Sequence, residues 1–198
     1  MRFSLGKLVV LAAVAGLVAV GWTKHEHRVH EQRSLAAIAS EIAGRPVGVH
    51  CPNFFTKLVN VSGEAGQVKF DDEGRPANYT DLSPQTCDEL AKFKRIDFSC
   101  LDTHTCGDTQ FQAAWAAHTL AHESFHLKGY EDEGVTECYA MQTTAFVAEQ
   151  LGMSADRAEE LQHWVWAKGY RNEPTDYQSS NCYPDGPLDL HPGSTNWP

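Results

Sequence analysis

Six cysteines constrain the fold of this chain more than any other feature of its sequence. None of them lies in the first part of the chain, where basic Arg2 and Lys7 precede an uncharged, mostly apolar stretch from Leu8 to Trp22. A basic start followed by an apolar core is typical of an export signal. We therefore expect the cysteines to reach an oxidising compartment and to form three disulfides. The cysteines are Cys51, Cys87, Cys100, Cys106, Cys138 and Cys182.

The spacing of the cysteines suggests a pairing. No Cys-x-x-Cys pair occurs, so a cysteine metal site is the weaker interpretation. Two of the six are close enough in sequence to close a small loop, and another pair would join the C-terminal tail to the helical part. We predict the pairs Cys100–Cys106, Cys51–Cys87 and Cys138–Cys182.

Residues 1–24 are predicted to be a signal peptide or a signal anchor. Residues 19–21 are small and lie at a plausible cleavage spacing, but they do not form a good Ala-x-Ala site. The apolar stretch is short for a membrane span of roughly 20 residues, although a snorkelling Lys7 extends it. Both outcomes stay open: secretion after cleavage, or a single-pass cell-surface anchor with the basic N-terminus inside.

Length and charge limit the domain organisation and the partners. The chain has 198 residues and a net charge of −10, and its Lys and Arg residues do not cluster, which argues against nucleic acid as a partner. Its length suits one domain with a short appendage. We predict a polar linker (25–33) that is a stalk or the start of a helix, a folded domain (34–182) and a loose C-terminal tail (183–198).

The first half of the domain is predicted to combine short helices and strands. A short amphipathic helix is expected over 34–46, and strand-like alternation occurs over 46–51 and 66–71, with a turn over 71–76. Ser83 as N-cap and Pro84 as first helical residue begin a helix within 81–95. A short strand is expected to lead from residue 95 into the Cys100–Cys106 loop.

The second half is predicted to be helical. One helix begins at a capping Asp108 and ends at Gly129, a second runs from about Asp132 to Gly152, and a third from Ser154 to Gly169. The remaining residues are rich in Pro, Gly and Asn, which indicates a wrapping or loose segment. The expected fold class is thus α+β: a mainly helical, disulfide-stapled domain with a small sheet, behind an apolar N-terminal segment.

The chemistry of the chain is concentrated at His122-Glu123-Ser124-Phe125-His126. On a helix, histidines four residues apart lie on one face, so both imidazoles can reach one zinc ion. The glutamate after the first histidine can take a proton from the metal-bound water. Apolar neighbours indicate a buried helix, where His and Glu are costly without a partner. His118 lies one turn earlier, but without a glutamate after it we interpret it as a pocket-lining or core histidine.

The third metal ligand has three candidates just downstream. Asp132 would complete a pattern similar to the short metzincin type, but no methionine turn is predicted. Glu133 and Glu137 lie one turn apart on the next helix. A tight helical hairpin would place Glu137 between the two histidines of the motif and Glu133 nearer the turn. Glu133 could also be an ordinary first-turn acid favoured by the helix dipole.

Residues 133–140, EGVTECYA, follow the motif and resemble the Glu-x-x-Ala-(Asp/Asn)-x-aromatic-Ala segment of gluzincin metallopeptidases. The resemblance is limited to about residues 118–148. It implies that Glu133 completes the zinc site with His122 and His126, and that Glu137 orients a ligand histidine by accepting its ring N–H. Thr136 stands where the family has alanine, and Glu137 stands where it has aspartate or asparagine.

The leading hypothesis is therefore an exported zinc-dependent endopeptidase, with Glu123 as general base and a peptide or protein as substrate. Tyr130, Tyr139 and His163 are candidates for stabilising the oxyanion, and the strand-like stretch 66–71 is a candidate for pairing with an extended substrate. The alternatives are a non-catalytic zinc-stabilised surface or binding module, and a disulfide-stapled domain without metal. The N-terminal segment would contact a membrane if it is not cleaved.

Overall fold

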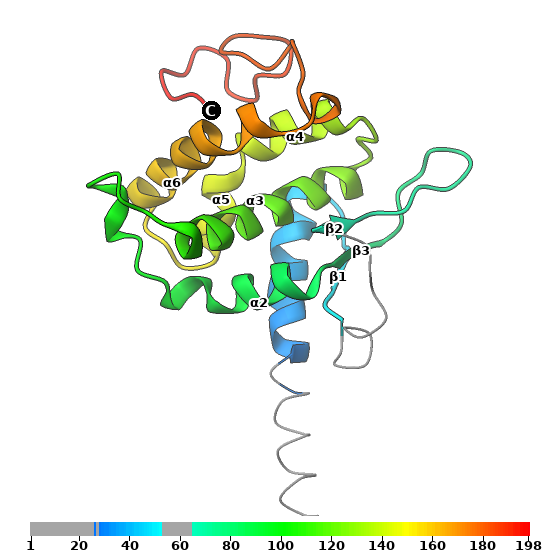
Figure 1. The fold of residues 1–198 in the computed structure, drawn as a ribbon. Coiled ribbons are helices and arrows are strands. Elements are labelled where there is room, and N and C mark those ends of the chain that lie inside the picture. Colours follow the sequence, from blue (N-terminus) through cyan, green and yellow to red (C-terminus); the bar gives the residue numbers. More distant parts are fainter. Residues whose placement is uncertain (1–25, 27, 53–64) are drawn as a thin grey trace, which may run out of the picture.

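Helices make up most of the protein, and one small sheet flanks them (Figure 1). The computed structural model describes residues 26, 28–52 and 65–198. An N-terminal helix covers residues 28–43. The strands are β1 (Gly48–His50), β2 (Gly66–Gln67) and β3 (Tyr79–Leu82). The helices that follow are α2 (Pro84–Lys92), α3 (Asp108–Lys128), α4 (Glu133–Met141), α5 (Thr144–Gln150) and α6 (Ala155–Lys168). Short 3-10 turns are η2 (Phe93–Arg95), η3 (Ser99–Leu101), η4 (Tyr170–Asn172) and η5 (Thr175–Tyr177).

Helix α3 lies at the centre of the fold, and α2, α4, α5 and α6 all pack against it. From Ala113 to Leu127 every residue of α3 except Trp115 is buried, which confirms the expectation of a buried helix. A helix that is buried all round needs no polar face. The polar side chains of α3 must therefore find partners on neighbouring elements.

The sheet lies beside the C-terminal half of α3 (Figure 1). Its order is β1-β3-β2, with β1 parallel and β2 antiparallel to the central β3. The predicted strand-like stretches contain β1 and β2, and the predicted turn over 71–76 lies in a hairpin closed by the bridge Phe70–Pro76. The guanidinium of Arg45 donates to the carbonyls of Leu127 and Ala77, which ties the end of α3 to the chain leading into β3.

All three predicted disulfides are present. Two of them brace the region before α3: one joins the end of β1 to α2, and the other closes the loop leading into α3. The third joins α4 to the C-terminal segment. The pairs are Cys51–Cys87, Cys100–Cys106 and Cys138–Cys182. Disulfides persist in oxidising environments, so these three indicate an extracellular or secreted protein.

Several local predictions are also confirmed. The predicted amphipathic helix is present and buries Leu35, Ile38 and Ile42, and residues 28–33 form its first turns. Ser83 caps α2 by accepting from the backbone N–H of Thr86, and Pro84 is its first residue. Helix α6 starts after Ser154 as expected.

Other predictions are wrong. The stretch after residue 95 forms the 3-10 turn η3 instead of a strand, and β3 was not expected. The N-cap of α3 is Gly107, with Asp108 as the first helical residue. The helix expected from Asp132 to Gly152 is divided into α4 and α5. The division has a tertiary cause, because the side chain of Gln162 accepts from the backbone N–H of Ala145 and so satisfies the start of a new helix.

The C-terminal segment, predicted to be wrapping or loose, lies on the side of the molecule where α4 and α6 are (Figure 1). The side chain of Gln142 donates to the carbonyl of Leu188 and accepts from the backbone N–H of Leu190, each at 2.8 Å. Gln162 donates to the carbonyl of the last residue, Pro198. Two buried glutamines of the helical core thus hold the tail through hydrogen bonds to its backbone. The tail sequence has no hydrophobic periodicity that would predict this attachment.

The predicted signal or anchor segment, residues 1–24, lies outside the described residues. Within residues 26, 28–52 and 65–198, no helix is both long enough and apolar enough to cross a membrane.

Removing the Cys138–Cys182 disulfide by the double change Cys138→Ala and Cys182→Ala should lower the free energy of unfolding. The pair closes 44 residues of chain, for which loop entropy gives about 4 kcal/mol. The matched pair Cys100→Ala and Cys106→Ala opens a separation of 6 residues and should cost about 2 kcal/mol. Denaturant unfolding of both variants measures the difference. A larger loss for the shorter loop would contradict the expectation.

Candidate metal centre

The reversal of the chain between α3 and α4 brings the predicted site residues together. Gly129 ends α3 in the left-handed region, at φ 114°, where glycine carries no steric penalty. Asp132 then caps α4 by accepting from the backbone N–H of Val135. Helix α4 packs back along α3, so its first two turns face the histidines of α3.

Three ligand-type atoms form a triangle at this place. Nε2 of His122 lies 3.0 Å from Nε2 of His126 and 3.0 Å from Oε2 of Glu133, and the remaining side measures 3.2 Å. Ligands about 2.0–2.1 Å from a tetrahedral zinc ion lie about 3.3 Å apart, so the triangle has the size of one face of such a site. The group is therefore close enough to hold a metal ion.

The second nitrogen of each ring orients the first. Nδ1 of His126 donates to the carbonyl of Tyr130 at 2.6 Å, and Nδ1 of His122 donates to Oε2 of Glu137 at 2.9 Å. A neutral imidazole that donates through Nδ1 has its lone pair on Nε2. In their neutral forms both rings thus direct lone pairs at one point, beside the carboxylate of Glu133, as a metal requires.

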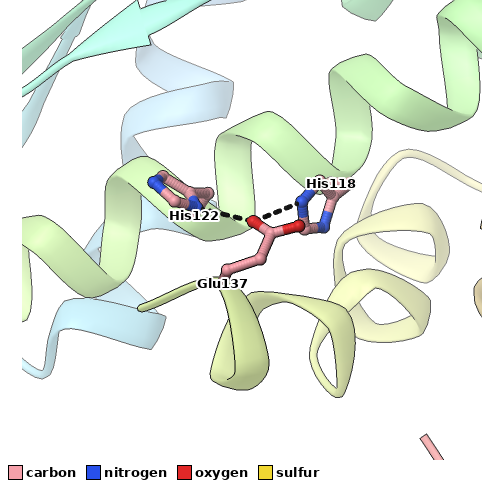
Figure 2. A group of neighbouring side chains, drawn as sticks. All are labelled: His118, His122 and Glu137. Atoms are coloured by element: carbon pink, nitrogen blue, oxygen red, sulfur yellow. Dashed lines mark hydrogen bonds and ion pairs between the residues drawn. The ribbon is translucent and has the colours of Figure 1, made fainter. Parts of the chain in front are cut away.

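Glu137 contacts Nδ1 of His122, whereas Glu133 contacts Nε2 on the other side of the ring. Figure 2 shows the Glu137 carboxylate between the rings of His122 and His118. Its Oε2 accepts from His122 and also from Nε2 of His118, at 3.0 Å. His118, His122 and Glu137 make a second group whose ligand-type atoms are close together, and all three are buried. The structure thus separates the two glutamates between which the sequence left the third ligand open: Glu133 lies with both motif histidines, and Glu137 lies behind one of them.

The carboxylates of Glu133 and Glu137 favour a positive charge at His122. Burial alone would lower the pKa of His122, but the hydrogen bonds to Glu133 and Glu137 outweigh burial and raise it to about 10. Burial would raise the pKa of Glu133, but hydrogen bonds from His122 and His126 lower it to about 2. Either a proton or a divalent cation would supply this positive charge, and the two compete for Nε2 of His122.

Glu123 points to the sheet side of α3. The residue is 4% exposed, and its Oε2 lies 3.2 Å from the hydroxyl of Thr80 on β3. A Cβ atom on Gly66 of β2 would lie 2.7 Å from the Glu123 carboxylate, so the glycine lets the strand lie directly against it. Burial raises the pKa of Glu123, and the neighbouring His122 and His126 only partly oppose the rise.

A pocket of about 580 Å³ opens over the triangle and Glu123. The edge strand β2 forms one wall, and the segment around η5 forms another. Phe70 meets the ring of His126 edge-on, with centroids 5.9 Å apart, and Tyr177 stacks on His122 at 5.7 Å. The site is therefore open on one side and bounded by aromatic rings.

Four other predicted candidates are not among the described residues that line this pocket. Asp132 is engaged as the cap of α4. Tyr130 and Tyr139 pack against each other with ring centroids 5.0 Å apart and are not among the described residues that line the pocket. His163 is exposed on α6 and does not line it either. His118 is buried and lines the pocket, in agreement with its interpretation as a core or pocket-lining histidine.

Sequence reasoning missed Tyr177 and Thr80. The predicted Cys138–Cys182 pair placed the tail beside the helix of Glu133 and Glu137, and an aromatic residue five positions before Cys182 was a signal for Tyr177. The close packing at Gly134, where an added Cβ would lie 3.2 Å from the carbonyl oxygen of Gln178, lets the tail reach that place. Thr80 had no comparable signal, because β3 itself was not predicted.

A scan against protein-family models, a search of curated proteins and a search of solved structures each found no match to this chain.

Proposed function

We propose that this protein is an exported zinc-dependent endopeptidase. His122, His126 and Glu133 bind the metal, and Glu123 is the general base. The observation that carries the proposal is the convergence of two histidine nitrogens and one carboxylate oxygen, 3.0 to 3.2 Å apart, at the floor of a pocket. The resemblance of residues 133–140 to the gluzincin segment supports the same division of roles between Glu133 and Glu137.

The donor set favours zinc. Two imidazole nitrogens and one carboxylate are a common ligand set for catalytic zinc, whereas Ca²⁺ and Mg²⁺ prefer oxygen ligands. The hydrogen bonds from the Nδ1 atoms to Glu137 and to the carbonyl of Tyr130 are the kind of support that ligand histidines receive in zinc sites.

An open site favours catalysis over a purely structural role. Structural zinc sites are closed by four protein ligands, whereas catalytic sites keep one position for water or substrate. Among the described residues, the group around His126 has three members, and a pocket adjoins it. The buried Glu123 also lines this pocket. A catalytic site requires a carboxylate there as general base, whereas a structural zinc site does not.

Bound zinc would supply Lewis-acid activation of a water molecule and of the scissile carbonyl group. Glu123 takes the proton of the attacking water and passes it to the leaving amine, a task for which a raised carboxyl pKa is suited. Tyr177 donates a hydrogen bond from its hydroxyl group to the developing oxyanion. Burial and the charge of Glu133 raise the pKa of Tyr177 to about 12, so the hydroxyl keeps its proton near neutral pH.

We propose further that the N-terminal segment, residues 1–24, directs export. The three disulfides support export. Cleavage of this segment would give a secreted protein, and an uncleaved segment would hold the protein at the cell surface.

Metal analysis together with a peptide-library digest tests the proposed function. The full chain should contain one zinc ion and should cleave members of a diverse peptide library, with products identified by mass spectrometry. Dialysis against a chelator should remove both the zinc and the cleavage, and zinc should restore them where Mg²⁺ and Ca²⁺ do not. Bound zinc without cleavage of any peptide would favour the non-catalytic module. A folded chain that takes up no zinc would contradict both.

A further inference from the structure

His118 is a buried histidine that takes no part in the ligand triangle. It lies on α3 one turn before His122 and is 2% exposed. Its ring packs against Trp115 with centroids 4.7 Å apart. Packing alone would suit an apolar side chain equally well, and a buried imidazole needs polar partners on both nitrogens. The partners of His118 therefore indicate what it does.

One partner is the carboxylate oxygen that also holds His122 (Figure 2). Oε2 of Glu137 lies 3.0 Å from Nε2 of His118 and 2.9 Å from Nδ1 of His122. An ionised carboxylate only accepts hydrogen bonds, so both rings donate to this one atom. His118 thus touches the group that orients a metal ligand, although it does not touch that ligand's metal-facing nitrogen.

The position of the Glu137 carboxylate depends on its two hydrogen bonds, because its other oxygen makes none among the described residues. Oε1 is buried and has no hydrogen-bond partner among the described residues. The carboxylate is therefore held through Oε2 alone, by two donors. If His118 no longer donates, a single hydrogen bond holds a buried anion, and the side chain has little to stop it turning away from His122.

The second partner of His118 fixes its ring from the opposite side. Nδ1 lies 3.2 Å from the hydroxyl of Thr144, which is fully buried at the start of α5. Thr144 is the first residue of α5, which follows the end of α4 at Met141 after two residues. A continuous polar connection thus runs from α5 through His118 and Glu137 to His122.

We propose that His118 is a positioning residue for the metal centre: it holds the Glu137 carboxylate against Nδ1 of His122, and through it sets the direction of the His122 ligand nitrogen. The proposal rests on the proposed zinc site. Partners behind ligand histidines typically change metal affinity by about 10- to 100-fold when they are removed.

Zinc affinity of matched variants, measured by competition with a chromophoric chelator, tests this role without any substrate. His118→Leu removes the donor and should weaken zinc binding about 10-fold or more. His118→Gln keeps an N–H donor of similar reach and should restore most of the affinity. In a Glu137→Ala background, His118→Leu should have no further effect, because the carboxylate through which it acts is absent. Ser124→Ala, which removes a buried hydrogen bond of the same helix, should leave the affinity unchanged.

Each result decides the matter. Equal affinity in wild type and His118→Leu, equal losses in His118→Leu and His118→Gln, or an undiminished loss in the Glu137→Ala background would overturn the positioning role. Two zinc ions in the wild type, one of them lost in His118→Leu, would make His118 a ligand and would also overturn it. If His118→Leu does not fold, Thr144→Val takes its place and should weaken zinc binding only while Glu137 is present. Absence of zinc from the wild type would instead refute the proposed function.

Discussion

Replacing Glu123 with glutamine should nearly abolish peptide hydrolysis while the protein keeps one zinc ion. General-base catalysis typically contributes about 100- to 10,000-fold to a rate, and we expect a loss in that range. Glutamine has nearly the same shape as glutamate and can still accept from Thr80, which lies 3.2 Å from Oε2 of Glu123. It cannot take up a proton from water, so the change removes the base and little else.

The measurement is kcat/KM on one cleaved peptide, with zinc content determined on the same samples. Glu131→Gln is the matched control, because it removes a carboxylate from the exposed rim of the same pocket. We expect the control to stay close to the wild-type rate. If Glu123→Gln and the control behave alike, Glu123 is not the base, and the non-catalytic zinc module becomes the better hypothesis.

The second large effect concerns the third ligand. His126→Ala and Glu133→Ala should each remove stoichiometric zinc, because each leaves two members of the triangle. Glu137→Ala should retain zinc but bind it about 10- to 100-fold more weakly, since Glu137 contacts Nδ1 of His122 and not the metal-facing nitrogen.

Zinc per chain, followed by titration of the zinc-free protein, separates these cases. Asp132→Asn is a useful control, because asparagine is also a good N-cap and the variant loses only the charge. It should bind zinc like the wild type, which also tests the metzincin-like alternative. If Glu137→Ala lost zinc and Glu133→Ala retained it, the metal would instead bind to the other group, formed by His118, His122 and Glu137.

Local rules were sufficient for much of this protein. The helix that carries the motif, its end at Gly129 and the cap at Asp132 follow from short-range signals that do not depend on the rest of the chain. The four-residue spacing of His122 and His126 likewise dictates that their rings share one face of a helix. Among the disulfides, sequence spacing favoured only the small Cys100–Cys106 loop; the other two predicted pairs are confirmed by the structure, although spacing alone did not determine them.

The resemblance of residues 133–140 implied different roles for Glu133 and Glu137, but local geometry left their positions open, and only the tertiary structure places Glu133 beside both motif histidines. Both lie on the correct face of α4, and a tight hairpin drawn from the sequence favoured the wrong one for the place beside both motif histidines. The angle and offset between α3 and α4 decide which carboxylate reaches which nitrogen, and these depend on packing against α5, α6 and the tail. The same long-range packing divides α4 from α5 and brings Thr144 to His118 and Tyr177 to His122. Periodicity and capping report only the nearest few residues, so contacts made across dozens of residues are beyond their reach.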